Sequence, residues 1–139
     1  MQFIRSFTGS TSSLLKKVAQ EGPNFYAKVN IYNFPFTVSK YDTITMHRLK
    51  DVQVGSVLKL TNVRELGSQS WAIKGRPWID PQTVHVEALV LEHGRGAKVQ
   101  AKQPKRRKGH TPLRTIKPLT TTLLIRDICV KVPENETNE

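Results

Sequence analysis

The chain of 139 residues contains 22 Lys and Arg against 11 Asp and Glu, which gives a formal net charge of +11. This length predicts a single domain. The positive charge favours nucleic acid or an anionic membrane surface as the partner, over acidic small molecules. No apolar run approaches the roughly 18 residues that a membrane span needs, so no spanning segment is predicted.

Residues 1–20 form a basic, Ser-rich segment without an acidic residue, which is the composition of a mitochondrial transit peptide. A secretory signal is disfavoured because no apolar core of about 7 to 15 residues follows the charge. An ordinary disordered tail is the other alternative. Residues 13–20 also have the length of a short helix that would end at Gly22-Pro23. We therefore assign residues 1–23 to an N-terminal mitochondrial extension or targeting segment.

From residue 24 the pattern changes to short β-rich runs divided by turn residues, including a predicted turn at residues 33–35. Seven segments are predicted to be strands: 25–32, 36–38, 43–46, 57–66, 70–74, 83–93 and 121–132. The pattern also allows β structure over residues 97–102. About six to eight short strands predict an all-β fold, a small barrel or sandwich, with a long basic loop between the last strands. This β domain covers residues 24–132, and residues 133–139 are an acidic polar tail.

No catalytic or metal-binding pattern is present. The four histidines lie far apart in the sequence, and none pairs with another His or a Cys at a metal spacing. His85 alternates with inward-facing valines, so it is expected to face solvent or RNA. The single cysteine, Cys129, excludes a disulfide framework and a cysteine zinc site. Its apolar neighbours predict a buried thiol, with a reactive thiol as the alternative.

Further signatures of enzymes are missing as well. No pair of carboxylates is placed for acid–base chemistry, and no phosphate loop, dinucleotide fingerprint or nucleophile elbow occurs. The sequence therefore predicts no enzyme activity, no cofactor, no metal and no small-molecule substrate. Trp71 and Trp78 are candidates for stacking on bases, although core or loop anchoring is the favoured interpretation.

The most distinctive segment is residues 93–126, which contains ten basic residues and no Asp or Glu. Four adjacent positive charges at Lys105 to Lys108 oppose compaction unless a polyanion supplies the counter-charge. A solvated surface or a nuclear address is the usual alternative for such a run. Because predicted strands flank the segment, we interpret residues 93–120 as a basic arm presented by the body to RNA. The predicted RNA-binding residues are Arg95, Lys98, Lys102, Lys105, Arg106, Arg107, Lys108, His110, Arg114 and Lys117.

Body and arm together resemble a known family, the bacterial-type ribosomal protein twenty-one of the large subunit, in a mitochondrial and fungal-like version. The resemblance covers roughly residues 26–128. Its most specific sections are Val86-x-Ala88-x-Val90, Gly94-Arg95-Gly96-x-Lys98-Val99 and the run from Lys105 to Gly109-His110. Weaker matches are Tyr26-Ala27, Val54-Gly55, Gly75-x-Pro77 and Leu124 to Ile128.

The chain also departs from the family pattern. Tyr32-Asn33-Phe34-Pro35 stands where the family has Gly-Gly-Lys-Gln, and Thr111 stands where an Arg is expected. Extra residues occur around 118–122. The resemblance implies a small β-barrel-like body, a long basic loop that reaches into large-subunit rRNA, proximity to large-subunit protein twenty, and a role in subunit assembly and stability.

The sequence thus predicts a non-catalytic, structural constituent of the mitochondrial large ribosomal subunit, located in the matrix. Its predicted partners are large-subunit rRNA and neighbouring ribosomal proteins, especially protein twenty. The alternative is a free RNA- or DNA-binding accessory protein of the mitochondrion, such as a nucleoid, mRNA or RNA-modification factor.

Overall fold

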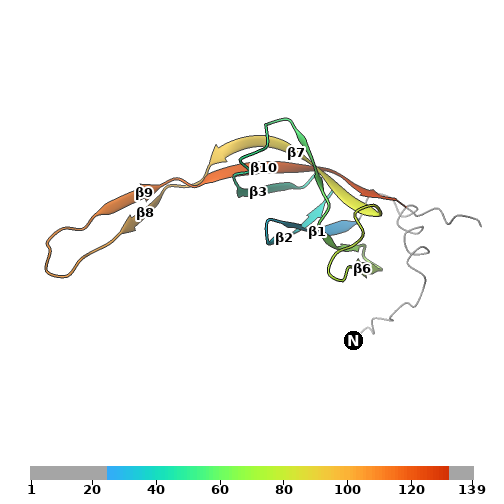
Figure 1. Cartoon of the computed structure of the whole chain (residues 1–139), viewed down its shortest axis with the longest axis horizontal. Coiled ribbons are helices and arrows are strands. Elements are labelled where there is room, and N and C mark those ends of the chain that lie inside the picture. Colours follow the sequence, from blue (N-terminus) through green and yellow to red (C-terminus); the bar gives the residue numbers. More distant parts are fainter. Residues whose placement is uncertain (1–24, 132–139) are drawn as a thin grey trace, which may run out of the picture. The chain divides into compact units, whose positions relative to one another are not determined.

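The computed structural model describes residues 25–131 of the chain (Figure 1). The predicted targeting segment, the short helix at residues 13–20 and the acidic tail lie outside the described residues. Within residues 25–131 the chain forms ten strands and no helix, so the all-β prediction is confirmed. The same residues contain no helix that is long and apolar enough to cross a membrane.

The ten strands form three sheets. The first has the order β2-β1-β5-β6, the second β3-β10-β7-β4, and the third contains β8 and β9 alone. The strand bounds are β1 Tyr26–Ile31, β2 Phe34–Ser39, β3 Thr43–His47, β4 Val57–Leu60, β5 Val63–Gly67, β6 Ala72–Lys74, β7 Val84–Arg95, β8 Val99–Lys102, β9 Leu113–Ile116 and β10 Leu119–Val130.

The described chain divides into two compact units. The first comprises residues 25–42, 59–88 and 125–131, and the second comprises residues 43–58 and 89–124. The two longest strands, β7 and β10, each contribute residues to both units.

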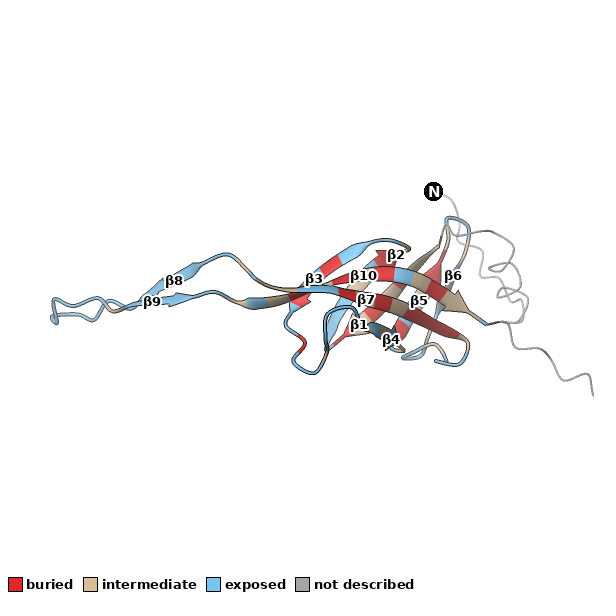
Figure 2. Cartoon of the chain, turned by 90° about the horizontal axis from the view of Figure 1, so that it is seen from above, coloured by how far each residue is buried: buried red, intermediate tan, exposed pale blue. Residues whose placement is uncertain are grey.

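The core of the first unit comes from strands of two sheets (Figure 2). Residues at every second position of β1 are buried, because successive side chains of a strand point to opposite faces. In the segment of β7 that belongs to this unit the predicted inward valines are buried, and His85 between them is buried as well. The buried apolar residues of this unit are Ala27, Val29, Ile31, Val38, Val63, Leu66, Val84, Val86, Ala88, Ile125 and Ile128.

The predicted single strand over residues 57–66 is wrong, because the chain turns at Thr61-Asn62 and forms β4 and β5 in two different sheets. A bulge then sets the faces of β5. Val63 pairs with Val29 and Glu65 with Lys28, so Arg64 is the extra residue. Without this insertion, Val63 and Leu66 would point to opposite faces, whereas both are buried.

The predicted turn at residues 33–35 is shifted in the structure. Tyr32 and Asn33 form the turn, with φ of 53° and 98°, and Phe34 and Pro35 already pair with β1. A proline fits in β2 because β2 is an edge strand of its sheet. Positive φ at both central residues is what a two-residue type I′ hairpin requires, and it is the reason such turns prefer Asn-Gly.

In the second unit, a buried hydrogen-bond network surrounds Thr121 of β10. The hydroxyl of Thr121 accepts the backbone N–H of Leu49 at 3.0 Å and lies 2.9 Å from Nδ1 of His93. The other ring nitrogen of His93 lies 2.8 Å from the carbonyl oxygen of Val52. Since a carbonyl only accepts, Nε2–H donates to Val52, and the Thr121 hydroxyl donates to Nδ1. The network therefore joins the connection between β3 and β4 to strands β7 and β10.

The substitution Thr121→Val should lower the free energy of unfolding by about 1 to 3 kcal/mol. Valine preserves the shape of the side chain but leaves the buried N–H of Leu49 and Nδ1 of His93 without their partner. Urea denaturation of the full chain measures the change. Thr122→Val is the matched control, because the Thr122 hydroxyl makes a long 3.4 Å bond to Glu92, and its effect should stay within roughly 0.5 kcal/mol. Equal losses in the two variants would contradict this role of Thr121.

Replacing Tyr32-Asn33 by Asn-Gly should raise the free energy of unfolding by roughly 1 kcal/mol, because both positions then carry residues that adopt positive φ readily. Tyr32 is exposed, so loss of its side chain removes little buried area. The opposite change, Asn33→Val, should be destabilising, since a β-branched residue is strained at positive φ. The urea midpoint should be highest for the Asn-Gly variant, intermediate for the wild type and lowest for Asn33→Val. An Asn-Gly variant that is less stable than the wild type would refute the assignment of this turn.

Candidate nucleic-acid interface

The basic arm is built on a β-hairpin. Strands β8 and β9 pair antiparallel from Val99 opposite Ile116 to Lys102 opposite Leu113. Two backbone bonds extend this ladder: Gly96 N–H donates to the Pro118 carbonyl at 2.7 Å, and Gln103 N–H donates to the Pro112 carbonyl at 3.3 Å. The sequence predicted a long basic loop between the last strands, and in the structure this segment contains a hairpin (Figure 1).

Cations occur on both faces of the hairpin. Residues directly opposite one another in an antiparallel pair lie on the same face. Arg114 therefore shares a face with Val99 and Ile116, while Lys102 lies on the other face with Leu113. The three apolar side chains of the hairpin are all more than half exposed. The hairpin thus offers positive charge together with uncovered apolar surface.

The structure places the predicted RNA-binding residues at three levels along the arm. Arg95, Lys98 and Lys117 lie near its base, where Gly96 and Pro118 are hydrogen-bonded. Lys102 and Arg114 lie on the paired strands. The loop that joins β8 to β9 contains the other five: Lys105, Arg106, Arg107, Lys108 and His110. All ten predicted residues are exposed (Figure 2).

The tip loop concentrates charge on a turn. Arg107 has a φ of 58° and Gly109 has a φ of 59°, so the chain reverses direction within the basic run. In the described part of the chain, the ion pairs are Lys40 with Asp127 and Lys74 with Glu65, and neither includes a cation of the arm. No acidic residue occurs from position 93 to 126. Positive charge on the arm is therefore not compensated locally and is available to an anionic partner.

The end of the acid-free segment has a different role from the arm. Thr121, Leu123 and Ile125 are buried on β10, so these positions belong to the packed interior. Arg126 is exposed but lies in the first unit, whereas the arm lies in the second. Burial along β10 therefore begins at Thr121.

The two tryptophans that are candidates for stacking on bases lie outside the unit that carries the arm. Trp71 is half-buried and Trp78 is 41% exposed, and both belong to the first unit. Trp78 lies in the connection between β6 and β7. Stacking of these rings on bases stays the less favoured alternative to core or loop anchoring.

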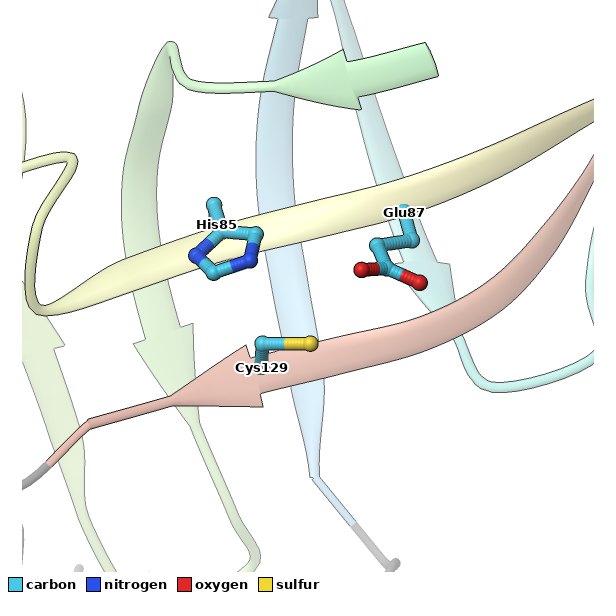
Figure 3. Close-up of side chains that lie close together, drawn as sticks. All are labelled: His85, Glu87 and Cys129. Atoms are coloured by element: carbon cyan, nitrogen blue, oxygen red, sulfur yellow. The ribbon is translucent and has the colours of Figure 1, made fainter. Parts of the chain in front are cut away.

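The sequence missed a cluster formed by His85, Glu87 and Cys129 (Figure 3). The expectation that His85 faces solvent or RNA is wrong, because the residue is 7% exposed. Burial lowers the pKa of His85, and the positive charge of Lys59 lowers it further. Cys129 is half-buried, and burial raises the pKa of its thiol, with smaller contributions from Glu87 and Asp127.

One part of this cluster had a signal in the sequence. His85 and Glu87 are two positions apart on a predicted strand, so they share a face. Cys129 joins them because β10 lies beside β7 in the second sheet, and this long-range pairing is not encoded in any local pattern.

Comparison with known proteins relates the chain to ribosomal proteins. The family model described as ribosomal prokaryotic L21 protein matches residues 25–128. A large ribosomal subunit protein bL21m of Arabidopsis thaliana is 40% identical over 103 residues, which cover 74% of this chain and 37% of that protein. An aconitase–ribosomal protein bL21m fusion protein of Schizosaccharomyces pombe is 28% identical over 134 residues, which cover 86% of this chain and 15% of the fusion. The chain thus spans well under two thirds of either relative.

Proposed function

Because the chain belongs to the ribosomal prokaryotic L21 protein family, we propose that it is a structural constituent of the mitochondrial large ribosomal subunit. Proteins of this family are ribosomal components and not enzymes. The mitochondrial location is supported by the two relatives, which both carry the mitochondrial designation bL21m. In this proposal the protein binds large-subunit rRNA, contributes to assembly of the subunit and serves mitochondrial translation.

The exposed basic arm is the observation that carries rRNA binding. Its cations are distributed from base to tip and have no acidic neighbour within residues 93–126. Arginine forks onto phosphate oxygens with two parallel hydrogen bonds, whereas lysine acts as a point charge. Such contacts position a protein on RNA but carry little sequence information. We therefore assign the ten predicted residues to phosphate contacts within folded rRNA, where shape and 2′-hydroxyl groups supply selectivity.

The uncovered apolar side chains of the hairpin support a second kind of contact. Val99, Leu113 and Ile116 are 56%, 52% and 61% exposed. Exposed apolar side chains among cations on both faces of a hairpin fit a segment that becomes covered inside a larger particle. In the proposal, they contact sugar and base surfaces or neighbouring ribosomal proteins, of which large-subunit protein twenty is the expected neighbour.

Changing Arg106, Arg107 and Lys108 to Ala should weaken binding to large-subunit rRNA and reduce its salt dependence. With roughly six to ten phosphate contacts, wild-type affinity should fall on the order of 10³ to 10⁵-fold between ~50 and ~200 mM salt. The slope of log affinity against log salt should be smaller by about 2 to 3 in the variant, since each lost contact removes about one unit. Filter binding or fluorescence anisotropy measures both quantities.

The matched control changes Arg48, Lys50 and Arg76 to Ala. These three cations are exposed and lie outside the arm, so the control removes the same net charge. It should change the salt slope much less than the arm variant does. If wild-type affinity does not depend on salt, or if both triple variants bind alike, the arm is not the electrostatic contact with rRNA.

Sedimentation separates the ribosomal role from that of a free RNA- or DNA-binding accessory protein. In mitochondrial lysates the tagged full chain should comigrate with large subunits after a high-salt wash, because a built-in component is held by many contacts at once. The triple arm variant should shift toward the top of the gradient while its circular dichroism spectrum stays unchanged. Release of the wild-type chain into the soluble fraction would support the accessory role instead.

A further inference from the structure

A second chemical site lies in the first unit, apart from the residues of the arm. His85 and Glu87 project from β7, and Cys129 projects from the neighbouring β10 (Figure 3). One nitrogen, one carboxylate oxygen and the sulfur of these residues all lie within 4.8 Å of one another. This outer face of β7 is opposite the face that carries the buried Val84, Val86 and Ala88.

We propose that His85, Glu87 and Cys129 bind a Zn²⁺ ion. Imidazole nitrogen, thiolate sulfur and carboxylate oxygen are the three donor types that zinc takes in proteins. The three side chains leave the fourth tetrahedral position for water or a ligand from a partner. Binding forms three metal–ligand bonds and releases the thiol proton of Cys129 to solvent. Cysteine and histidine spacings along the chain gave no sign of this zinc site. The site depends instead on the pairing of β7 with β10.

The environment of His85 supports metal binding. His85 is 7% exposed, and its Nδ1 has no hydrogen-bond partner within the described residues, which is uncommon for a buried polar atom in a folded protein. Either ring nitrogen of His85 can serve as the donor of the cluster.

The separation of the donor atoms requires a small adjustment. Zinc bonds of about 2.0 to 2.3 Å at tetrahedral angles put two ligand atoms about 3.3 to 3.8 Å apart. Since the three donors lie within 4.8 Å of one another, no pair must approach by more than roughly 1 to 1.5 Å. Glu87 is half-buried and has rotatable side-chain bonds, so its carboxylate can move without displacing either strand.

Some charges around the site oppose a bound cation and others favour it. Lys59 and Lys131 lower the pKa of His85, and both cations oppose a bound dication. Glu87 and a thiolate at Cys129 together carry two negative charges, which offset the ion. Asp127 adds a further acidic group near Cys129, and its Oδ1 accepts hydrogen bonds from Lys40 at 3.1 Å and from the N–H of Ile128 at 2.9 Å. Asp127 does not belong to the group of ligand atoms that lie within 4.8 Å of one another, so it stays outside the ligand set.

Titration of the metal-free full chain with Co²⁺, under a reducing agent that does not bind metal, tests the site. The wild type should develop a thiolate-to-cobalt charge-transfer band at one equivalent, and Zn²⁺ should displace the cobalt and raise the Tm. Cys129→Ser should lose the band. Glu87→Gln, which preserves size, should weaken Zn²⁺ binding by more than the roughly 10- to 100-fold expected for an outer-sphere residue. His110→Gln, on the exposed arm, is the histidine control and should keep the cobalt band and the Zn²⁺ affinity of the wild type.

Circular dichroism and thermal unfolding of the metal-free variants establish that each is folded before its affinity is compared. The absence of a thiolate band in the wild type would overturn the proposal. Equal Zn²⁺ affinity of the wild type and either folded cluster variant would overturn it as well. These readouts do not depend on rRNA, so a failed zinc site and a failed ribosomal role remain distinguishable.

Discussion

The alternation of side chains along β7 is the constraint on which much of this protein depends. Its even-numbered residues from Val84 to Val90 are buried, and this face closes the interior. The odd-numbered positions carry His85 and Glu87. A slip of one residue would exchange the two faces, which would expose the valines and bury Glu87. The core and the polar functional groups are therefore set by the same register.

The arm depends on a different balance of forces. Residues 97–111 and 113–117 are exposed, so burial of apolar surface contributes little to holding the hairpin together. Cross-strand hydrogen bonds and the pairing of Val99 with Ile116 are its internal support. Repulsion among the cations of the tip acts against compaction. A segment of this kind gains most when a polyanion neutralises it, which fits a protein that becomes part of a ribonucleoprotein particle.

Two histidines on β7 differ in their hydrogen bonding because their surroundings differ. Both ring nitrogens of His93 are hydrogen-bonded, and one neutral tautomer satisfies the whole network with Thr121. His85 is more deeply buried, yet its Nδ1 has no hydrogen-bond partner within the described residues. The first is therefore a structural histidine that orders the connection between β3 and β4. The second has a ring nitrogen without a partner and lies beside Glu87 and Cys129.

The sequence by itself determined the all-β class, the position of the arm between the last strands and the family, because these follow from local periodicity, composition and motifs. It also identified the inward face of β7, since alternation is a property of neighbouring residues. Only the tertiary structure decided the bulge at Arg64, the division of residues 57–66 between two sheets, the burial of His85 and its meeting with Cys129. Each of these depends on which strands pair and in what register, and that is set by contacts between residues far apart in the chain.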